Sequence, residues 1–461
     1  MHKIFDSPAA ALADVADGSS VAIAGFGVGH SYPNSLVIAL RDQGARGLCI
    51  VANSLGAGGD FRPQILVQND QVKRLVLSFS ARPGLPSPEE AKIKAGEIEL
   101  ELVPQGILVE RLRAAGAGLP AFYSPVTVGT PLQAGKEIRS FGDQKFVLEH
   151  SLPVDVALIR GHRADQYGNV EFRGSSAHFH ASFAKAAKLT IVEVEEIVEA
   201  GAIPPERVGL PGIFVSRVVL TTTTYPAPKG LMGRRAADSN RDYFGKAALS
   251  RSGMAKRVAE MLPDDAYVNL GSGLPTLVAS HAAGKTIILH AENGALGYDL
   301  IQESDEVDVD FFDAAGNFIH MRPGGAVFDS VVSFEIARSG RLSAVVLGAY
   351  QVSEQGDLAN WSLPGQIGGG IGGAMDLAVS GSRVIALMEH CDSKGRPKLV
   401  ETCSFPLTAP GCVDAVVTDL VVLERINGVF TVTAMVEGFT ADEIRSITPM
   451  KIAFADEIRL M

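Results

Sequence analysis

The stretch AYVNLGSGLPTLV, residues 266–278, repeats a pattern that first occurs in VAIAGFGVGHSYPNSLVI, residues 21–38. In each stretch an apolar run leads into a glycine turn, and a proline and a second apolar run follow. An apolar run before a glycine turn predicts a buried strand, and proline favours the first turn of a helix. We therefore expect one strand, turn and helix unit in each half of the chain, with turn amides that suit an anion.

The chain has 461 residues, which is more than one hydrophobic core usually organises. Residues 226–244 contain proline and glycine and lack periodicity, which predicts a linker between a first domain, 1–225, and a second domain, 245–461. Short apolar runs at 154–159, 189–194 and 384–388 suit buried strands. The expected fold class is α/β, with two similar domains and mostly parallel sheets.

Composition excludes several classes of protein. The net charge of −11 argues against nucleic acid as a partner, because phosphate binding draws on clustered Lys and Arg. No apolar run approaches the ~18 residues of a membrane span, and the N-terminus does not resemble a secretion signal. Four widely spaced cysteines lack metal-binding spacing and suit a reducing compartment, so we expect a cytoplasmic protein without a metal site.

Common catalytic motifs are missing from the sequence. The glycine turn GFGVG, residues 25–29, continues with His30 where a dinucleotide-binding fingerprint has its third glycine. A Walker A sequence, HExxH and GxSxG do not occur. Nucleotide hydrolases, zinc proteases and serine hydrolases therefore have no motif support.

Two other segments are candidates for a site. HAENGALG, residues 290–297, follows an apolar run and so lies at the carboxyl end of a strand, where ligand sites of α/β sheets gather. The same residues also suit a simple turn with Glu292 in solvent. Six glycines among residues 365–373 leave backbone N–H groups free to face a bound oxygen, although a mobile loop is the alternative.

Taken together and in order, the strings of this chain resemble class I CoA transferases of the succinyl-CoA:3-oxoacid type, with α and β subunits fused. The resemblance covers nearly the full length, and makes 1–225 an α-like and 245–461 a β-like domain. It rests on GFGVGHSYPNSL, PQGILVERLRAAGAGLPAFYSP, RADQYGNVEFRG, LTIVEVEEIVEAG, NLGSGLPTLVA, AENGALG, LGAYQVSEQGDLANW, GIGGAMDL and EHCDSKGRPKLVETCSFPLT.

The resemblance implies that Glu292 is the nucleophile and that the Gly373 amide and Asn53 stabilise an oxyanion, with Ser54 an equally good match for the Asn53 position. With a reference pKa of ~4.3, this carboxylate is expected to be ionised at neutral pH without a partner base. The resemblance also implies acyl-glutamyl anhydride and glutamyl-CoA intermediates, CoA as co-substrate and no tightly bound cofactor. The implied partners are an acyl-CoA, a small carboxylic acid and a second copy of the chain. Residues expected to bind substrate or CoA are Asn269, Gly271, Gly273, Gly25, Gly27, Gln105, Asn293, Gly294, Gly372 and Asn317.

Several positions depart from the family pattern. Ala291 replaces the usual Ser, Gln366 and Gly369 replace loop lysines, and Asn317 stands where ketoacid transferases often have Lys. The loss of lysines leaves less positive charge for CoA phosphates or for a dicarboxylate. His178 and His180 replace asparagines, and would either contact substrate or restore a hydrogen bond.

Two alternatives remain beside CoA transfer. The altered neighbours of Glu292 suit an acyl-CoA hydrolase on the same scaffold. A catalytically silent protein that binds a metabolite would keep the fold without the chemistry. Because an acyl-enzyme must be shielded from water, the transferase hypothesis places the site in a cleft between the two halves.

Overall fold

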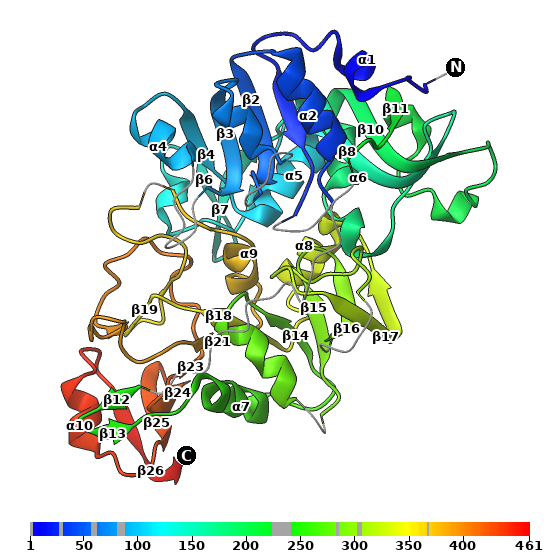
Figure 1. The fold of residues 1–461 in the computed structure, drawn as a ribbon. Coiled ribbons are helices and arrows are strands. Elements are labelled where there is room, and N and C mark those ends of the chain that lie inside the picture. Colours follow the sequence, from blue (N-terminus) through cyan, green and yellow to red (C-terminus); the bar gives the residue numbers. More distant parts are fainter. Residues whose placement is uncertain are drawn as a thin grey trace.

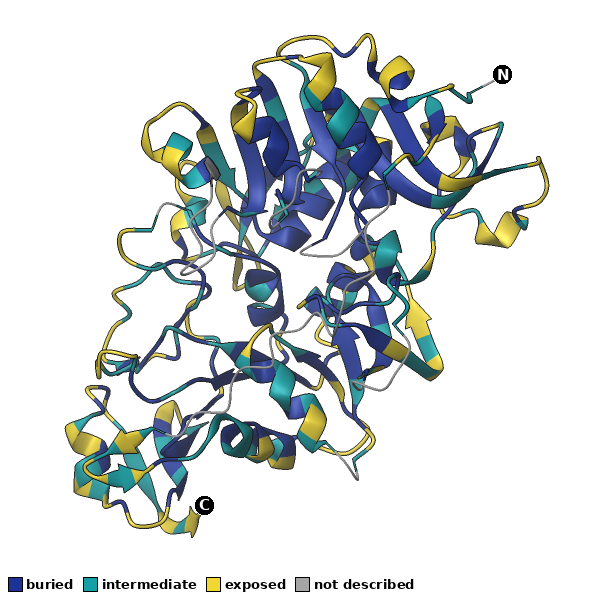
Figure 2. Cartoon of the chain, viewed as in Figure 1, coloured by how far each residue is buried: buried dark blue, intermediate teal, exposed yellow. Residues whose placement is uncertain are grey.

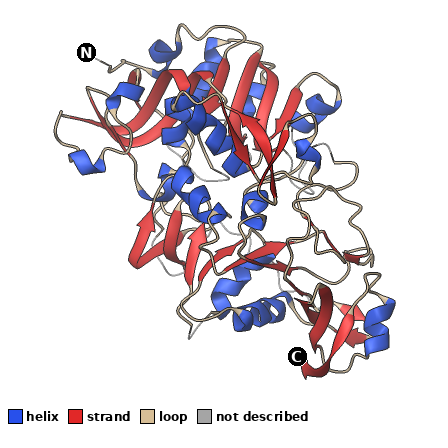
Figure 3. Ribbon diagram, turned by 180° about the vertical axis from the view of Figure 1, so that it is seen from behind, coloured by secondary structure: helices blue, strands red, loops and turns tan. Residues whose placement is uncertain are grey.

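The structure is a computed structural model that describes residues 3–26, 31–56, 62–80, 88–223, 241–282, 285–301, 307–366 and 368–461. Each half of the chain forms one large sheet, and helices lie between the two sheets as well as on their other faces (Figures 1 and 3). The two termini lie at opposite ends of the molecule (Figure 1). The predicted α/β class with two sheet-centred halves is confirmed.

The sheet of the first half has the strand order β11-β10-β8-β1-β2-β3-β4, and all neighbours in this order are parallel. Helices cover both of its faces, so its inner strands such as β1 and β2 are nearly continuous buried runs, whereas the edge strand β4 alternates Glu and Leu. The short β9 pairs with β8 at one end. The strands are β1 (Ser20–Ile23), β2 (Leu48–Ser54), β3 (Val72–Phe79), β4 (Glu99–Leu102), β8 (Val154–Asp165), β9 (Val170–Glu171), β10 (Ala187–Val198) and β11 (Arg217–Leu220).

The sheet of the second half has the order β17-β16-β15-β14-β18-β21-β23-β24-β25-β26. Its centre, from β15 to β23, is parallel, and antiparallel hairpins flank this centre on both sides. The strands are β14 (Tyr267–Leu270), β15 (Ile288–Ala291), β16 (Ala295–Leu300), β17 (Ile319–Val327), β18 (Ala344–Gly348), β21 (Arg383–Leu387), β23 (Ala415–Val417), β24 (Val421–Ile426), β25 (Val429–Met435) and β26 (Ala453–Leu460).

Three small sheets and ten α-helices complete the described part of the chain. The small sheets are β5 (Ala121–Ser124), β6 (Ile138–Phe141) and β7 (Gln144–His150); β12 (Asp242–Tyr243) and β13 (Lys246–Ala247); and β19 (Gln351–Ser353), β20 (Leu358–Ala359) and β22 (Leu399–Val400). The α-helices are α1 (Pro8–Leu12), α2 (Asn34–Gln43), α3 (Gln64–Gln68), α4 (Pro88–Lys94), α5 (Gln105–Gly116), α6 (His180–Ala186), α7 (Arg251–Met261), α8 (Ser330–Arg338), α9 (Ala374–Ala378) and α10 (Ala441–Ser446). None of the helices in these ranges is long and apolar enough to cross a membrane.

The repeat predicted from the sequence is present, with one difference. Strands β1 and β14 lie where the two apolar runs predict them, and α2 follows directly after Pro33. In the second unit, however, Leu274–His281 is a 3-10 helix. Both the amide and the hydroxyl of Thr276 donate to the Gly273 carbonyl, which closes the first turn at a spacing of three residues.

The boundary between the domains stays a prediction, because residues 224–240 lie outside the described part. The end of the predicted linker, Asp242–Tyr243, forms β12 and pairs with β13.

The two halves meet in a shared apolar core. Ile107 and Leu108 on α5 belong to the same buried cluster as Phe334 on α8 and Met375 on α9. Figure 2 shows this buried region continuing from the upper sheet into the lower one. The halves are therefore held against each other by hydrophobic burial, at about 25 cal/mol per Å² of apolar surface.

The glycine-rich segment of the second half also pairs with the end of β3 in the first half. Ser80 donates its amide to the Gly369 carbonyl over 3.0 Å, and Ile371 donates to the Ser78 carbonyl over 3.0 Å. Gly369 accepts no larger residue here, because a Cβ would lie 2.3 Å from the Trp361 carbonyl oxygen. A lysine here, which the resemblance would lead one to expect, would therefore break the contact.

A buried charge cluster lies beside this contact. Asp376 is fully buried and accepts from the Gly106 amide and from Arg338, each over 3.0 Å. Arg338 also donates to Glu110 on α5 over 3.0 Å. One guanidinium thus balances a buried carboxylate of its own half and joins it to a carboxylate of the other half.

Substitution Arg338→Met should destabilise the protein by about 3–5 kcal/mol, because it leaves Asp376 buried without a cation. Thermal and urea unfolding measure the loss. The matched control is Arg341→Met, three residues away on the exposed surface, which should change stability by less than about 0.5 kcal/mol. Equal stability of the two variants would contradict the role assigned to Arg338.

Candidate active site

Glu292 occupies the turn between β15 and β16, at the carboxyl end of the parallel centre of the second sheet. The Gly294 amide closes the turn on the Ala291 carbonyl over 2.9 Å, and Gly294 has a φ of 115° that suits glycine. The Phe328 amide donates to the Gly294 carbonyl, and the Asn293 side chain donates to the Phe312 carbonyl. These bonds fix the turn, and Glu292 is half-buried and lines a cavity instead of lying free in solvent.

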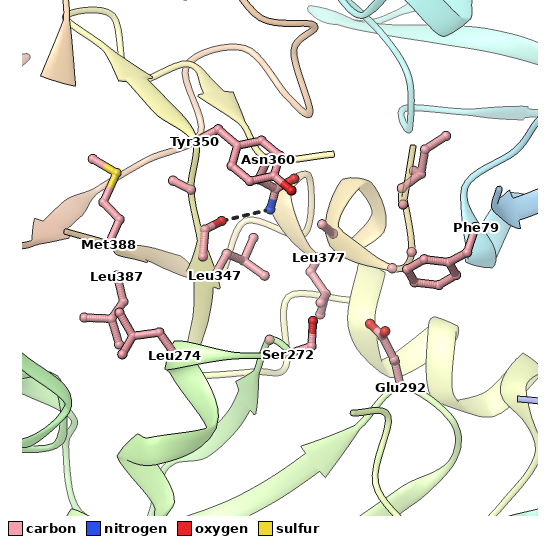
Figure 4. A pocket seen from close by; sticks show the side chains of 18 of the residues that line it. Phe79, Ser272, Leu274, Glu292, Leu347, Tyr350, Asn360, Leu377, Leu387 and Met388 are labelled. Atoms are coloured by element: carbon pink, nitrogen blue, oxygen red, sulfur yellow. Dashed lines mark hydrogen bonds between the residues drawn. The ribbon is translucent and has the colours of Figure 1, made fainter. Parts of the chain in front are cut away.

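The cavity lies in the second half, beside its contact with the first half, and has a volume of about 340 Å³. Phe79 from the first half closes one side, and the glycine-rich segment and Glu292 form the adjacent wall (Figure 4). The remaining wall is mixed, with the apolar side chains of Leu347 and Met388 beside the charged ones of Glu389 and Lys398. A group bound here would be partly shielded from water.

The Gly373 amide lies against the Glu292 carboxylate and donates a hydrogen bond to it. A Cβ on Gly373 would lie only 2.1 Å from Oε2 of Glu292. The φ of Gly373 is −89°, which any residue adopts, so the close approach of the carboxylate and not the backbone conformation requires glycine. The carboxylate is thus in contact with main chain on the side facing the glycine-rich segment.

The pKa of Glu292 is raised to about 7. Burial is the largest cause, the negative charges of Asp376 and Asp313 add to it, and the Gly373 amide acts in the opposite direction. The expectation that this carboxyl has an ordinary pKa is therefore wrong. Desolvation disfavours the charged form, and sequence reasoning had no measure of burial at this position.

Asn53 at the end of β2 is connected to Glu292 through the glycine-rich segment. Its Oδ1 accepts from Gln105 Nε2 over 2.8 Å, and its buried Nδ2 has no partner among the described residues. The backbone N–H of Gln105 in turn donates to the Gly372 carbonyl over 3.0 Å. Gln105 therefore orients Asn53 so that a free N–H donor remains beside the segment that holds Gly373.

The alternative residue at this position, Ser54, has its own partner. Its hydroxyl lies 2.9 Å from the Tyr32 hydroxyl. The geometry thus favours Asn53 over Ser54 as the available donor of this strand end.

Only some of the predicted glycines line the cavity. Gly271 and Gly372 line the cavity with Glu292 and Gly373. Gly273, with a φ of 83°, caps the 3-10 helix and is not among the lining residues. Gly25 packs against the Tyr32 ring, and Gly27 lies outside the described residues.

Two of the predicted asparagines are engaged elsewhere. The side-chain Nδ2 of Asn269 lies 3.1 Å from Nδ1 of His290, and donates to the His290 carbonyl. Asn317 donates to Asp313 over 2.9 Å. Asn269 therefore supports the strand that leads to Glu292, and Asn317 supports the neighbouring Asp313. Neither asparagine lines the cavity.

Most of the first glycine turn lies outside the described residues, but the start of the helix that follows it binds a carboxylate of the protein itself. Near the start of α2, the Leu36 amide donates to Glu193 over 3.0 Å. Burial raises the pKa of Glu193 to about 7. This helix start therefore already holds a carboxylate of its own domain.

His178 and His180 are fully buried. His178 lies 2.6 Å from the Ser31 hydroxyl and accepts from the Phe179 amide, and His180 accepts from the Arg160 amide. Burial lowers the pKa of His180 to about 3, so it is neutral. Of the two roles left open, these contacts favour the hydrogen-bonding one.

Sequence reasoning missed several residues at the cavity, namely Tyr350, Asn360, Glu389 and Lys398. Asn360 donates to the Gly348 carbonyl over 3.0 Å and fixes the cavity wall (Figure 4). All four belong to the family-like strings LGAYQVSEQGDLANW and EHCDSKGRPKLVETCSFPLT. The strings marked the right segments, but did not show which side chains face the site.

Comparisons with a family model and with known proteins point to the same family. A family model described as "Coenzyme A transferase" matches residues 5–221 and 251–446. Human succinyl-CoA:3-ketoacid coenzyme A transferase 2, mitochondrial, is 38% identical over 480 residues, which cover 100% of this chain and 91% of that protein. One of the separate subunits of the succinyl-CoA:3-ketoacid coenzyme A transferase from Xanthomonas campestris is 45% identical, and the match covers 47% of this chain and 88% of that protein.

Among solved structures, the apoenzyme of an acyl-CoA transferase from Escherichia coli O157:H7 superposes with a TM-score of 0.81. The match covers 100% of this chain and 95% of that one at 19% identity, which shows a common fold.

One prediction is contradicted by these relatives. The expected cytoplasmic location is wrong by this comparison, because human and mouse proteins that match almost the whole chain carry mitochondrial names. Few cysteines indicate a reducing compartment, but do not tell one such compartment from another. The comparisons do not support the expected homodimer, and a homo-oligomer stays a prediction.

The matched bacterial protein corresponds to about half of this chain, and the family model matches in two stretches, one in each half. The chain therefore belongs to the coenzyme A transferase family, and is a CoA transferase of the type that joins both subunits in one polypeptide.

Proposed function

We propose that the protein transfers CoA from an acyl-CoA to a free acid of the 3-oxoacid or short-chain class, through covalent intermediates on Glu292. The observation that carries this proposal is a carboxylate with a pKa raised by burial, which lines a cavity beside the contact of the two halves and accepts the Gly373 amide. The substrate class is supported by the full-length relatives, which are named as succinyl-CoA:3-ketoacid transferases.

The first half-reaction consists of two exchanges. A carboxylate oxygen of Glu292 attacks the thioester carbon, the C–S bond breaks, and an acyl-glutamyl anhydride and CoA thiolate result. The thiolate then attacks the Glu292 carbonyl carbon, which gives glutamyl-CoA and releases the donor acid as its carboxylate. The acceptor carboxylate runs both steps in reverse, and the energy of the thioester is kept throughout.

Each exchange passes through a tetrahedral oxyanion that needs a positioned donor. When the thiolate attacks Glu292, the oxyanion forms on an oxygen of Glu292 itself, and the Gly373 amide already donates to this carboxylate. Asn53 Nδ2, which is buried and unpartnered among the described residues, is the donor proposed for the oxyanion on the substrate acyl group.

Substitution Glu292→Gln should lower kcat by at least about 10⁴-fold, because the amide is not a nucleophile. After incubation with acyl-CoA, borohydride or hydroxylamine should mark Glu292 in the wild type, as seen by peptide mass spectrometry, and leave the variant unmarked. Glu335→Gln, which removes an exposed carboxylate on α8, serves as the control and should retain activity.

A wild-type enzyme that turns over without any label on Glu292 would refute the covalent mechanism. Release of free CoA in the absence of an acceptor acid would instead identify the protein as a hydrolase.

The pH dependence of kcat/KM should report the raised pKa of Glu292. Only the deprotonated carboxylate attacks, so kcat/KM should fall about tenfold per pH unit below about pH 7 and level off above it. A phosphate monoester titrates near pH 6, so the profile should be repeated with a 3′-dephospho-CoA thioester, which lacks that group. An acid limb that begins below pH 5 would show that Glu292 has an ordinary pKa.

Substitution Gly373→Ala should lower kcat by about 10²-fold or more, because the new methyl group would displace Oε2 of Glu292 from the amide. Thermal unfolding should change little, since the backbone conformation suits alanine. Gly253→Ala on α7 is the matched comparison, as its Cβ would lie no closer than 3.4 Å to any atom and the residue does not line the cavity, and a much smaller loss is expected. Equal losses in the two variants would argue against a specific role of Gly373.

A further inference from the structure

A second contact between the two halves is made by the 3-10 helix Gly174–Ala177 of the first half, which packs against residues 308–312 of the second. At the rim of this contact, Arg173 forms an ion pair with Asp310 over 2.5 Å. Gly174 has a φ of 58°, and a Cβ here would lie 2.4 Å from the Asp310 carbonyl oxygen. Glycine therefore allows the main chains of the two halves to approach closely.

The hydroxyl of Ser175 lies at the centre of this contact. Ser175 is fully buried, donates to the Phe312 carbonyl over 2.8 Å and accepts from the Phe312 backbone N–H over 2.9 Å. The two residues are 137 positions apart in the chain. A buried backbone group without a partner destabilises the fold, so this one hydroxyl of the first half fixes where Phe312 lies in the second.

The Phe312 carbonyl connects this contact to the nucleophile. It also accepts from Nδ2 of Asn293 over 2.8 Å, and Asn293 directly follows Glu292. The Asn293 side chain is buried, and its Oδ1 has no partner among the residues that the structure describes. The bond to Phe312 is therefore the one that orients this side chain. Ser175 and Asn293 thus bind the same carbonyl from different halves of the chain.

The same segment of the first half also supports the residue before the nucleophile. The His178 carbonyl accepts from the Ser330 backbone N–H, at the start of α8, over 3.0 Å. One turn later on α8, the Ser333 hydroxyl donates to the Ala291 carbonyl over 3.3 Å. Ala291 directly precedes Glu292. The first half therefore reaches the residues on both sides of the nucleophile.

The position of the carboxylate leaves little tolerance. Its Oε2 would lie only 2.1 Å from a Cβ on Gly373, so the carboxylate is packed tightly against main chain. A displacement of about 1 Å in a reacting group is enough to cost on the order of 10²-fold in rate. The bonds that hold the turn of Glu292 are thus as important for the reaction as the donors that face the carboxylate.

We propose that Ser175 is a positioning residue, which acts through the Phe312 carbonyl and Asn293 to hold the turn of Glu292 in its reactive arrangement. The nucleophile is then aligned only while the first half is docked on the second. This inference rests on the proposed function, since it concerns the alignment of the carboxylate that is proposed to attack.

Substitution Ser175→Ala should slow the formation of the covalent intermediate on Glu292 by about tenfold or more, because the turn loses its anchor in the first half. Single-turnover trapping with hydroxylamine at saturating acyl-CoA measures this rate. The acyl-CoA concentration that gives half of the maximal rate should stay within about threefold, since Ser175 does not line the cavity. Ser175→Cys, which keeps a similar size but only a weak donor, should slow the same step less, and replaces the alanine variant should that one not fold.

The matched control is Ser182→Ala. Ser182 is a buried serine of the first half, and its hydroxyl donates to the Phe179 carbonyl of the same half over 2.9 Å. The loss of this bond lowers stability without touching the turn of Glu292, so the trapping rate should stay within about twofold of the wild type.

A double-mutant cycle tests the shared carbonyl. Asn293→Ala should slow trapping as well, and the variant with both Ser175→Ala and Asn293→Ala should be about as slow as the slower single variant. Asn293→Ala combined with Ser182→Ala should instead show the product of the two separate effects.

Hydrogen exchange of residues 288–296 gives a readout that needs no turnover. The Gly294 amide closes the turn on the Ala291 carbonyl, so this peptide should exchange faster in Ser175→Ala than in the wild type or Ser182→Ala.

A trapping rate of Ser175→Ala equal to that of the control would overturn the inference. Multiplicative losses in the Ser175 and Asn293 double variant, or slower trapping with unchanged exchange of 288–296, would also overturn it, because Ser175 would then act by another route. Failure of the proposed function would be recognised separately, as a wild-type protein that turns over without any trapped group on Glu292.

Discussion

The main-chain pairing between segment 368–373 and the carboxyl end of β3 is the contact on which the site depends. It brings Gly373 of the second half against Glu292, and Gln105 and Asn53 of the first half next to Gly372. Because these are backbone hydrogen bonds between close strands, the segment has little room for side chains. The requirement for close approach explains the glycine at position 369 better than flexibility does, because a Cβ there would lie 2.3 Å from the Trp361 carbonyl oxygen.

Glu292 combines two demands that oppose each other. A cavity that excludes water protects an acyl-enzyme, but the same burial raises the pKa of the carboxyl to about 7. Between the ordinary pKa of 4.5 and this value the folded state binds the proton more tightly than the unfolded chain, so folding stability falls as pH rises. Above about pH 7 the Glu292 carboxylate is thus deprotonated and reactive, and in this pH range it contributes least to folding stability. Such a conflict between activity and stability is common for active sites.

The charges around the nucleophile form one system. Asp376 raises the pKa of Glu292, and Arg338 at 3.0 Å from Asp376 limits this effect by compensating the negative charge. The same guanidinium reaches Glu110 on α5. Stability of the contact between the halves and ionisation of the nucleophile are therefore coupled through a single side chain.

The sequence alone determined the α/β class, the repeated strand and glycine turn, the family, and Glu292 and Gly373 as candidates, because local periodicity and ordered motifs are properties of the chain itself. Only the tertiary structure decided that Asn317 and Asn269 serve the surroundings of the site, that Glu193 occupies the first helix start, and that Lys398 faces the cavity. It also decided the pKa of Glu292. Burial, charge pairing and the direction of a side chain depend on residues that are distant along the chain, such as Glu193 for Leu36 and Asp376 for Glu292, and therefore exist only in the folded protein.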